Sequence, residues 1–301
     1  MEELNKAYHI ATTGRRGPVL IDLPMNIQRS EVENPVYDMT FEDKHTDAAA
    51  AQQAADTILE ALEQAKRPVI MLGHGVDSSF SQQKLIRFAQ KRQIPIITSV
   101  LAKSVLGYDH PLNFGCIGGA YGHRYANMIA NAKSDLLLCF GISLCTRQIG
   151  TKVHEFARGA KIIRIDIDPY NLQRDIHENG INEVKLQAET GAVIDCLAKA
   201  AAPDTEGISD WLNVCTEIKE NLQAVDDATP ERYPNRMIAD LSDMLEDTSA
   251  IAVDVGQHMV WSYQSFKNHE GQKLLFSGGH GAMGYGLPAA IGAYYATGKP
   301  T

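Results

Sequence analysis

The chain has 301 residues, of which 44% are hydrophobic and 22% charged, so it can hold one large domain or two ordinary ones and has a normal globular composition. Its net charge of −9 argues against nucleic acid or an anionic membrane as main partner, because both attract basic surfaces. No apolar run approaches the ~20 residues of a membrane span, and the polar start MEELNKAYHI is no secretory signal, so we expect a cytoplasmic protein. The five cysteines form no C-x-x-C pair, and we expect them to be buried free thiols.

The first part of the chain predicts a short helix and then a strand. The run Pro18–Leu23 is apolar and closed by Pro24, which is typical of a strand. Residues 31–47 are polar and irregular and predict a linker. An alanine-rich helix is expected at about 48–65, because its apolar residues recur near a period of 3.6.

Between residues 48 and 205, short apolar runs alternate with amphipathic helices. Strands that are apolar throughout and alternate with helices imply a parallel sheet that helices cover on both faces, an α/β fold. A weaker strand is expected at 183–188. The four stronger strands are expected at about 68–73, 94–99, 135–140 and 161–167.

The last hundred residues predict a linker and a second α/β unit. Residues 206–234 hold a helix between two polar breaks. From residue 235 the order is helix, strand, helix, strand, helix, with strands in AIAVDVG and KLLFSGG. We expect a second parallel sheet that is unfinished at Thr301.

Two loops follow these last strands. DVGQHMVW places Gly256, Gln257 and His258 at the carboxyl end of a strand, where ligands of open parallel sheets bind. Glycine lets the backbone approach an anion, and a helix N-terminus favours negative charge, although a turn with a surface histidine explains the same residues. SGGHGAMGYG has five glycines and one methionine. Five glycines give the backbone more conformational freedom than a tight helix–strand crossing needs, so the segment predicts a pocket.

Two further motifs leave alternatives open. Gly73-His74-Gly75 follows a strand but lacks the third glycine of the dinucleotide fingerprint, which favours a tight turn over phosphate binding. Asp166 and Asp168 of DIDP end another strand, where acids either bind ribose hydroxyls or cap the next helix.

Three segments in this order and spacing resemble the thiamine diphosphate enzymes of the acetolactate synthase type: GRRGPVLIDLP, DVGQHMVW and SGGHGAMGYGLPAAIGA. The middle of the chain resembles that family's central domain, including ANAKSDLLLCFG, DIDP and NFGCIGGAYGHRYAN. The resemblance implies a central Rossmann-like domain plus part of a thiamine diphosphate-binding domain.

On the family's plan, the chain is expected to be a fragment. Its segments are the end of the pyrimidine-binding domain (1–30), a linker (31–47), the central domain (48–205), a linker with a helix (206–234) and the N-terminal half of the diphosphate-binding domain (235–301). The activating glutamate would lie before Met1, and the magnesium-binding GDG segment, which does not occur in the sequence, after Thr301. The resemblance thus implies no catalytic residue or metal ligand within these residues, and a chain that is inactive alone.

The resemblance also implies roles for five residues. Gly256, Gln257 and His258 would contact the diphosphate. The backbone of Gly281 and Met283 would hydrogen-bond the aminopyrimidine, and the Met283 side chain would hold the cofactor bent.

FAD is a separate expectation. Biosynthetic members hold it partly through an RFDDR loop and a later GD pair, which read SLCTR and Gln187-Ala188 here. Arg15, Arg147, Asp166 and Asp168 stay compatible with a nucleotide (FAD-like) site, but these departures lead us to expect no bound FAD.

The implied activity is decarboxylation of a pyruvate-like 2-oxo acid and transfer of the two-carbon unit to an acceptor carbonyl. The complete enzyme would use thiamine diphosphate and Mg²⁺ and form a homodimer or homotetramer, with a small 2-oxo acid and neither nucleic acid nor membrane as partner. Two alternatives stay open: a nucleotide-binding α/β oxidoreductase, and a non-catalytic binding or assembly module.

Overall fold

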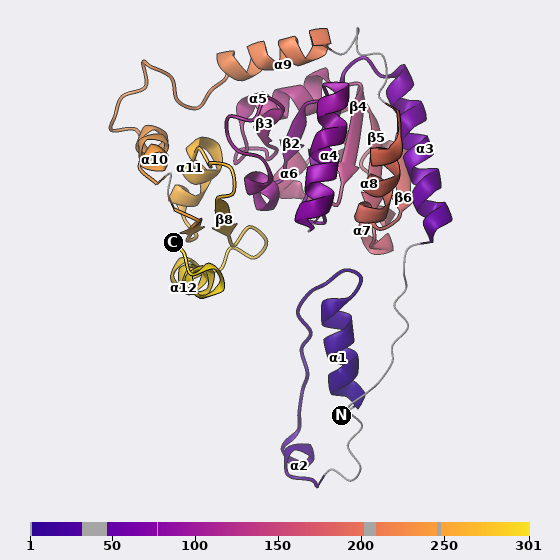
Figure 1. Ribbon diagram of the computed structural model, residues 1–301, viewed down its shortest axis with the longest axis vertical. Coiled ribbons are helices and arrows are strands. Elements are labelled where there is room, and N and C mark those ends of the chain that lie inside the picture. Colours follow the sequence, from indigo (N-terminus) through magenta and orange to yellow (C-terminus); the bar gives the residue numbers. More distant parts are fainter. Residues whose placement is uncertain (1, 32–46, 77, 202–208, 246–247) are drawn as a thin grey trace. The chain divides into compact units, whose positions relative to one another are not determined.

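The computed structural model describes residues 2–31, 47–76, 78–201, 209–245 and 248–301 (Figure 1). The chain divides into two compact units, Met1–Ala48 and Ala49–Thr301, which we describe separately. The strands are β1 (Pro68–Leu72), β2 (Ile96–Thr98), β3 (Asn113–Cys116), β4 (Leu136–Phe140), β5 (Lys161–Asp166), β6 (Glu183–Gln187), β7 (Ala250–Val253) and β8 (Lys273–Phe276).

The α-helices are α1 (Glu2–Thr12), α2 (Met25–Gln28), α3 (Ala48–Gln64), α4 (Ser79–Arg92), α5 (Arg124–Asn127), α6 (Thr146–Ile149), α7 (Pro169–Gln173), α8 (Thr190–Lys199), α9 (Ser209–Asn221), α10 (Pro234–Asp243), α11 (Gln257–Ser265) and α12 (Gly286–Thr297). Short 3₁₀ segments are η1 (Val100–Val105), η3 (Val153–Glu155) and η4 (Glu178–Gly180), and η2 (Met128–Lys133) is a π-helix. Among the described residues, no helix is long and apolar enough to cross a bilayer.

The larger unit is built on a six-stranded sheet in the order β3-β2-β1-β4-β5-β6. Every neighbouring pair is parallel, which confirms the predicted α/β fold and the four predicted strands. The sequence does not predict β3, because NFGC is short and has Gly115 at φ +73° in its middle. The switch in strand order falls between β1 and β4, whose carboxyl ends carry Gly73 and Gly141.

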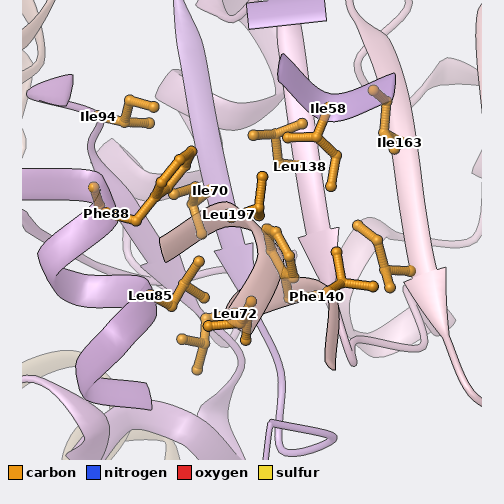
Figure 2. Close-up of a cluster of buried hydrophobic side chains, with 14 of the residues drawn as sticks. Ile58, Ile70, Leu72, Leu85, Phe88, Ile94, Leu138, Phe140, Ile163 and Leu197 are labelled. Atoms are coloured by element: carbon orange, nitrogen blue, oxygen red, sulfur yellow. The ribbon is translucent and has the colours of Figure 1, made fainter. Parts of the chain in front are cut away.

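Alternate residues of the strands feed two separate hydrophobic clusters, one on each face of the sheet. In β1, Ile70 and Leu72 face one cluster and Val69 and Met71 the other. The first cluster gathers side chains from α3, α4 and α8 over β1, β4 and β5 (Figure 2). Burial on both faces explains why β1 and β4 are apolar at every position rather than at every second one.

Helix α9, predicted within the linker 206–234, packs on the central sheet. Trp211 is buried and its indole N–H donates to the Pro68 carbonyl over 3.0 Å. Cys215 lies in the same hydrophobic cluster, and Lys219 donates to the Asn113 carbonyl over 2.9 Å. Residues 202–205, at the predicted domain boundary, lie outside the described residues, as does most of the predicted linker 31–47.

The expectation of buried free thiols holds for three of the five cysteines, Cys116, Cys139 and Cys215, whereas Cys145 and Cys196 are partly exposed. Burial raises the pKa of the Cys139 thiol to about 12. Such thiols stay protonated at neutral pH and act as small core residues.

The C-terminal part carries the predicted second parallel sheet. Strands β7 and β8 pair in parallel, with Val253 opposite Phe276. Its core is small and includes Tyr263 of α11, whose ring packs edge-on against Phe276 with centroids 4.6 Å apart.

The smaller unit corrects one expectation. Residues 18–23 were predicted as a strand, but no strand is assigned there among the described residues, and Leu20 is 92% exposed. A strand needs a neighbour for its backbone N–H and C=O groups, and none of the described segments of this unit pairs with it. An apolar run alone therefore does not suffice to form a strand.

Candidate functional site

Two loops leave the same edge of the small sheet. Because β7 and β8 are parallel and in register at Val253 and Phe276, the loops 254–256 and 277–285 both start from their carboxyl ends. Ligands of open parallel sheets bind at this edge.

Asp254 joins the two loops. Its Oδ1 accepts the N–H of Gly284 over 2.9 Å and its Oδ2 accepts the N–H of Gly286 over 3.0 Å, and Val255 N–H donates to Oδ1 over 2.6 Å. The N–H groups of Gly286, Val255 and Gly284 hold the pKa of Asp254 below its usual range. The sequence gives this residue no assigned role, although an acid between a strand end and a glycine is a detectable signal.

Gly256, Gln257 and His258 form the exposed start of α11. Gly256 is the N-cap, and none of the described side chains caps this helix end. A Cβ at Gly256 would meet the His258 ring at 2.7 Å, so glycine lets that imidazole fold back over the turn. The first turn of a helix carries N–H groups without intrahelical partners and a partial positive charge. This end can therefore receive an anion.

The glycine-rich loop needs its glycines for two different reasons. Gly281 and Gly284 have φ of +68° and +82°, which L-side chains rarely adopt. Gly286 is buried, and a Cβ there would meet Asp254 at 3.2 Å. Within the loop, the Met283 side chain is 86% exposed, an unusual exposure for a large apolar group.

Arg147 holds the start of this loop. Its Nη1 donates to the carbonyls of Gly278 and Gly279 over 3.3 and 3.2 Å. A Cβ at Gly278 would meet Leu101 of η1 at 2.9 Å, so the loop also approaches the central domain closely. Arg147, expected at a nucleotide site, thus supports the glycine loop.

The remaining residues of the expected nucleotide site lie elsewhere. Asp168 caps α7 by accepting the Tyr170 N–H over 2.9 Å, and Asp166 accepts the Asp168 N–H over 2.9 Å. These bonds fit the helix-cap alternative for DIDP. Arg15 belongs to the smaller unit, between α1 and α2.

The Gly73-His74-Gly75 motif is accounted for by backbone packing. A Cβ at Gly73 would lie 2.0 Å from the Gly141 carbonyl oxygen, and one at Gly75 2.7 Å from the Gly141 Cα. Gly75 N–H also donates to that carbonyl over 2.9 Å. This crowding supports the tight-turn alternative over phosphate binding.

Two descriptions of known protein families match parts of this chain. Residues 55–197 match the thiamine pyrophosphate enzyme central domain, and residues 254–301 match the C-terminal TPP-binding domain of these enzymes. The chain belongs to the thiamine pyrophosphate enzyme family.

Within the family, the chain is similar to acetolactate synthase large subunits along nearly its whole length. It is 33% identical to the probable acetolactate synthase large subunit of Methanocaldococcus jannaschii over 97% of this chain and 50% of that protein. Identity is 31% to the acetolactate synthase isozyme 1 large subunit of Escherichia coli, over 96% of this chain and 50% of that protein. The chain is also 32% identical to acetolactate synthase 1, chloroplastic, of Nicotiana tabacum, over 99% of this chain and 44% of that protein. The chain spans about half the length of the curated relatives it matches.

Proposed function

We propose that this chain contributes part of the cofactor site of a thiamine diphosphate-dependent enzyme that decarboxylates a 2-oxo acid and joins the two-carbon unit to an acceptor carbonyl. One observation carries the proposal: an uncapped helix start and a glycine loop with an exposed methionine lie at one sheet edge, joined by Asp254. The acetolactate synthase relatives support the reaction class.

The start of α11 fits the diphosphate end of the cofactor. Gln257 and His258 are exposed, and their side chains can donate hydrogen bonds to phosphate oxygens beside the first-turn N–H groups. Neither side chain carries a fixed positive charge. Neutralising a diphosphate therefore calls for a cation such as Mg²⁺, and we propose that its ligands come from outside these 301 residues.

The glycine loop fits the ring end. A Cβ added at Gly279 or Gly284 would meet no described atom within 4 Å apart from those of the adjacent residues. A flat ring can therefore approach the backbone there. When bound, thiamine diphosphate supplies the carbanion chemistry at the 2-oxo acid carbonyl. The Met283 side chain would then lie against the ring and exclude water, and burying it would contribute roughly 1.5–3 kcal/mol. The backbone of Gly281 and Met283 would hydrogen-bond the aminopyrimidine.

The finer features follow the same proposal. The complete enzyme is a cytoplasmic homodimer or homotetramer that binds no FAD. Asp166 and Asp168 already cap their own turn, and Arg147 already bonds the glycine loop, which supports the absence of flavin. Purified protein with oxidised-flavin absorbance would contradict this part.

Cofactor binding is tested by titrating thiamine diphosphate with Mg²⁺ into the full 301-residue chain. We expect weak binding with the largest amide NMR shifts at Gln257, His258, Gly281 and Gly284, and smaller shifts with thiamine lacking the diphosphate. Saturable shifts confined to other residues would refute the site.

Activity is tested by adding pyruvate and following carbon dioxide and acetolactate. We expect no turnover above that of free cofactor with this chain alone, because no catalytic base or metal ligand is assigned within it. Clear turnover would contradict this expectation and require a catalytic base among these residues.

A further inference from the structure

A pocket of about 210 Å³ lies in the larger unit between the second half of α4 and the end of α8. It shares no lining residue with the two cofactor loops. No Asp or Glu belongs to its described lining, whereas α4 supplies four cations, Lys84, Arg87, Lys91 and Arg92. Positions 84, 87 and 91 are three and four residues apart, so they follow one face of the helix on successive turns. The pocket thus concentrates positive charge in a chain whose net charge is −9.

Three of these four cations have no counter-charge. Lys84 pairs with Asp195 over 2.7 Å, but no hydrogen bond or ion pair of the Arg87 or Lys91 side chain is found among the described residues. The helix dipole favours Lys91, which lies in the last turn, but it does not account for Arg87 one turn earlier. Like charges four positions apart destabilise a helix. An anion in the pocket offsets this repulsion.

Arg92 forms the inner wall of the pocket. The residue is 7% exposed, its Nη2 donates to the Ala201 carbonyl over 2.8 Å, and its Cζ lies 4.7 Å from the centre of the Phe88 ring. These contacts hold the guanidinium in place and use one of its five N–H groups. None of its nitrogens is among the described buried atoms that lack a partner, so its unbonded N–H groups are accessible where Arg92 lines the pocket. Burial lowers the pKa of this guanidinium.

From these contacts we infer a second ligand site, which binds a phosphate group, either as the free ion or on a small ester. A held guanidinium with spare N–H groups matches two phosphate oxygens. Arg87 and Lys91 at the rim add two further positive charges, which suit a group that carries about −1.5 to −2 at pH 7 better than a carboxylate. Ala198 and Ala200 leave small apolar surface for the rest of an ester.

The test titrates inorganic phosphate and phenyl phosphate separately into the ¹⁵N-labelled full chain at pH 7 and constant ionic strength. We expect the Arg92 Nε–H and the Ala201 amide to shift saturably with a Kd of about 0.1–10 mM. The tighter of the two probes distinguishes an ester from the free ion. Phenyl sulfate has nearly the same shape and one charge fewer, and should bind at least roughly fivefold more weakly than phenyl phosphate. Thiamine diphosphate is absent, so the result does not depend on the proposed cofactor site.

Matched variants separate the pocket from general charge effects. Arg87→Gln/Lys91→Gln should weaken the tighter probe at least roughly fivefold. Lys66→Gln/Arg158→Gln removes the same two kinds of charge outside the pocket and should leave the Kd within about twofold. All four positions are exposed, so folding should be unaffected. No saturable shift of Arg92, equal affinity for phenyl sulfate, or equal Kd values in the two double variants would each overturn the inference.

A further variant tests whether the chain fills the pocket itself. Asp204 and Glu206 follow Ala201 closely in sequence and lie outside the described residues. Asp204→Asn/Glu206→Gln should leave the Kd within about threefold if the pocket serves a separate ligand. Phosphate binding that is found only in this variant would show that the chain's own carboxylates are the anions, and would overturn the inference.

Discussion

At the scale of single residues, the cofactor loops depend on a few side chains that lie far apart in sequence. Asp254 is about thirty positions before the glycines whose N–H groups it accepts, and Arg147 is more than 130 positions before Gly278. Each acts on backbone atoms rather than on another side chain. The loop shape is therefore set from outside the loop as well as by its glycines.

The Asp254 tether should depend on pH in a predictable direction. Its folded-state pKa is lowered, chiefly by the Gly286 N–H, so its stabilising effect is complete above the unfolded aspartate pKa of about 3.9 and is lost as pH falls through the lower folded value. We expect the amides of Gly284 and Gly286 to lose hydrogen-exchange protection only below that range. In Asp254→Asn the protection should be low at every pH, whereas Asp227→Asn, an exposed control, should behave like the parent. Unchanged protection in Asp254→Asn would contradict the tether.

Met283 should matter for cofactor binding and little for folding. Because the side chain is 86% exposed, Met283→Ala should change the free energy of unfolding by no more than about 0.5 kcal/mol, yet weaken thiamine diphosphate binding. Met244→Ala, at a residue 81% exposed in the C-terminal part, is the matched control and should affect neither. Urea denaturation and cofactor titration measure the two effects. A large stability loss in Met283→Ala would mean that the side chain is core.

At the scale of elements, periodicity predicts most of the larger unit and local context explains the exceptions. The strands β1, β2 and β4 are mostly or wholly apolar runs, and β5 has three isoleucines around Arg164, so all four are predictable from their own sequences. Strand β3 is not predicted from the sequence, because its pairing with β2 stabilises it more than its own short sequence does. Residues 18–23 show the opposite case: their apolar sequence predicts a strand, but they pair with no other strand among the described residues.

The site is predictable to a similar extent. The glycine-rich loop and the methionine within it, Met283, can be recognised from the local sequence alone, because the conformational freedom of glycine does not depend on distant residues. The contacts of Asp254 and Arg147 cannot be read from the sequence, because they depend on which loops the sheet brings together.

The edge pairing of β5 and β6 contains one buried ion pair. Arg164 Nη1 lies 2.7 Å from Glu183 Oε1, and the two side chains are 2% and 0% exposed. Removing one charge of a buried pair leaves the other uncompensated, so Glu183→Gln should cost about 3–5 kcal/mol of unfolding free energy. Glu155→Gln breaks an exposed pair with Lys152 and should cost no more than about 1 kcal/mol. Urea denaturation of both variants measures the difference, and equal losses would show that Arg164 is satisfied by its bonds to the Arg174 and Asn171 carbonyls alone.

At the scale of the whole larger unit, two cores of very different size share one chain. The central sheet has a large hydrophobic cluster on each face. Among the described residues, the C-terminal part has a two-stranded sheet and a core of five buried residues, and much of α12 is exposed, including Leu287 and Tyr295. A two-stranded sheet is marginal by itself, so the C-terminal part draws stability from contacts such as Asn268 with Leu106.

Unfolding of the chain should therefore not be two-state, and its two tryptophans can report this. Trp211 is buried in the central domain, and Trp261 lies in α11 of the C-terminal part. In Trp211→Phe the remaining indole follows the C-terminal part, and in Trp261→Phe it follows the central domain. We expect the Trp261 signal to change at a urea concentration lower by roughly 1 M, because the smaller core offsets less chain entropy. Trp211→Phe also removes the bond to Pro68 and costs the central domain about 1 kcal/mol, but the central-domain transition is followed in Trp261→Phe, where that bond is intact. Coincident transitions in the two variants would show instead that the contacts between the two parts are strong enough to make the unit unfold as one.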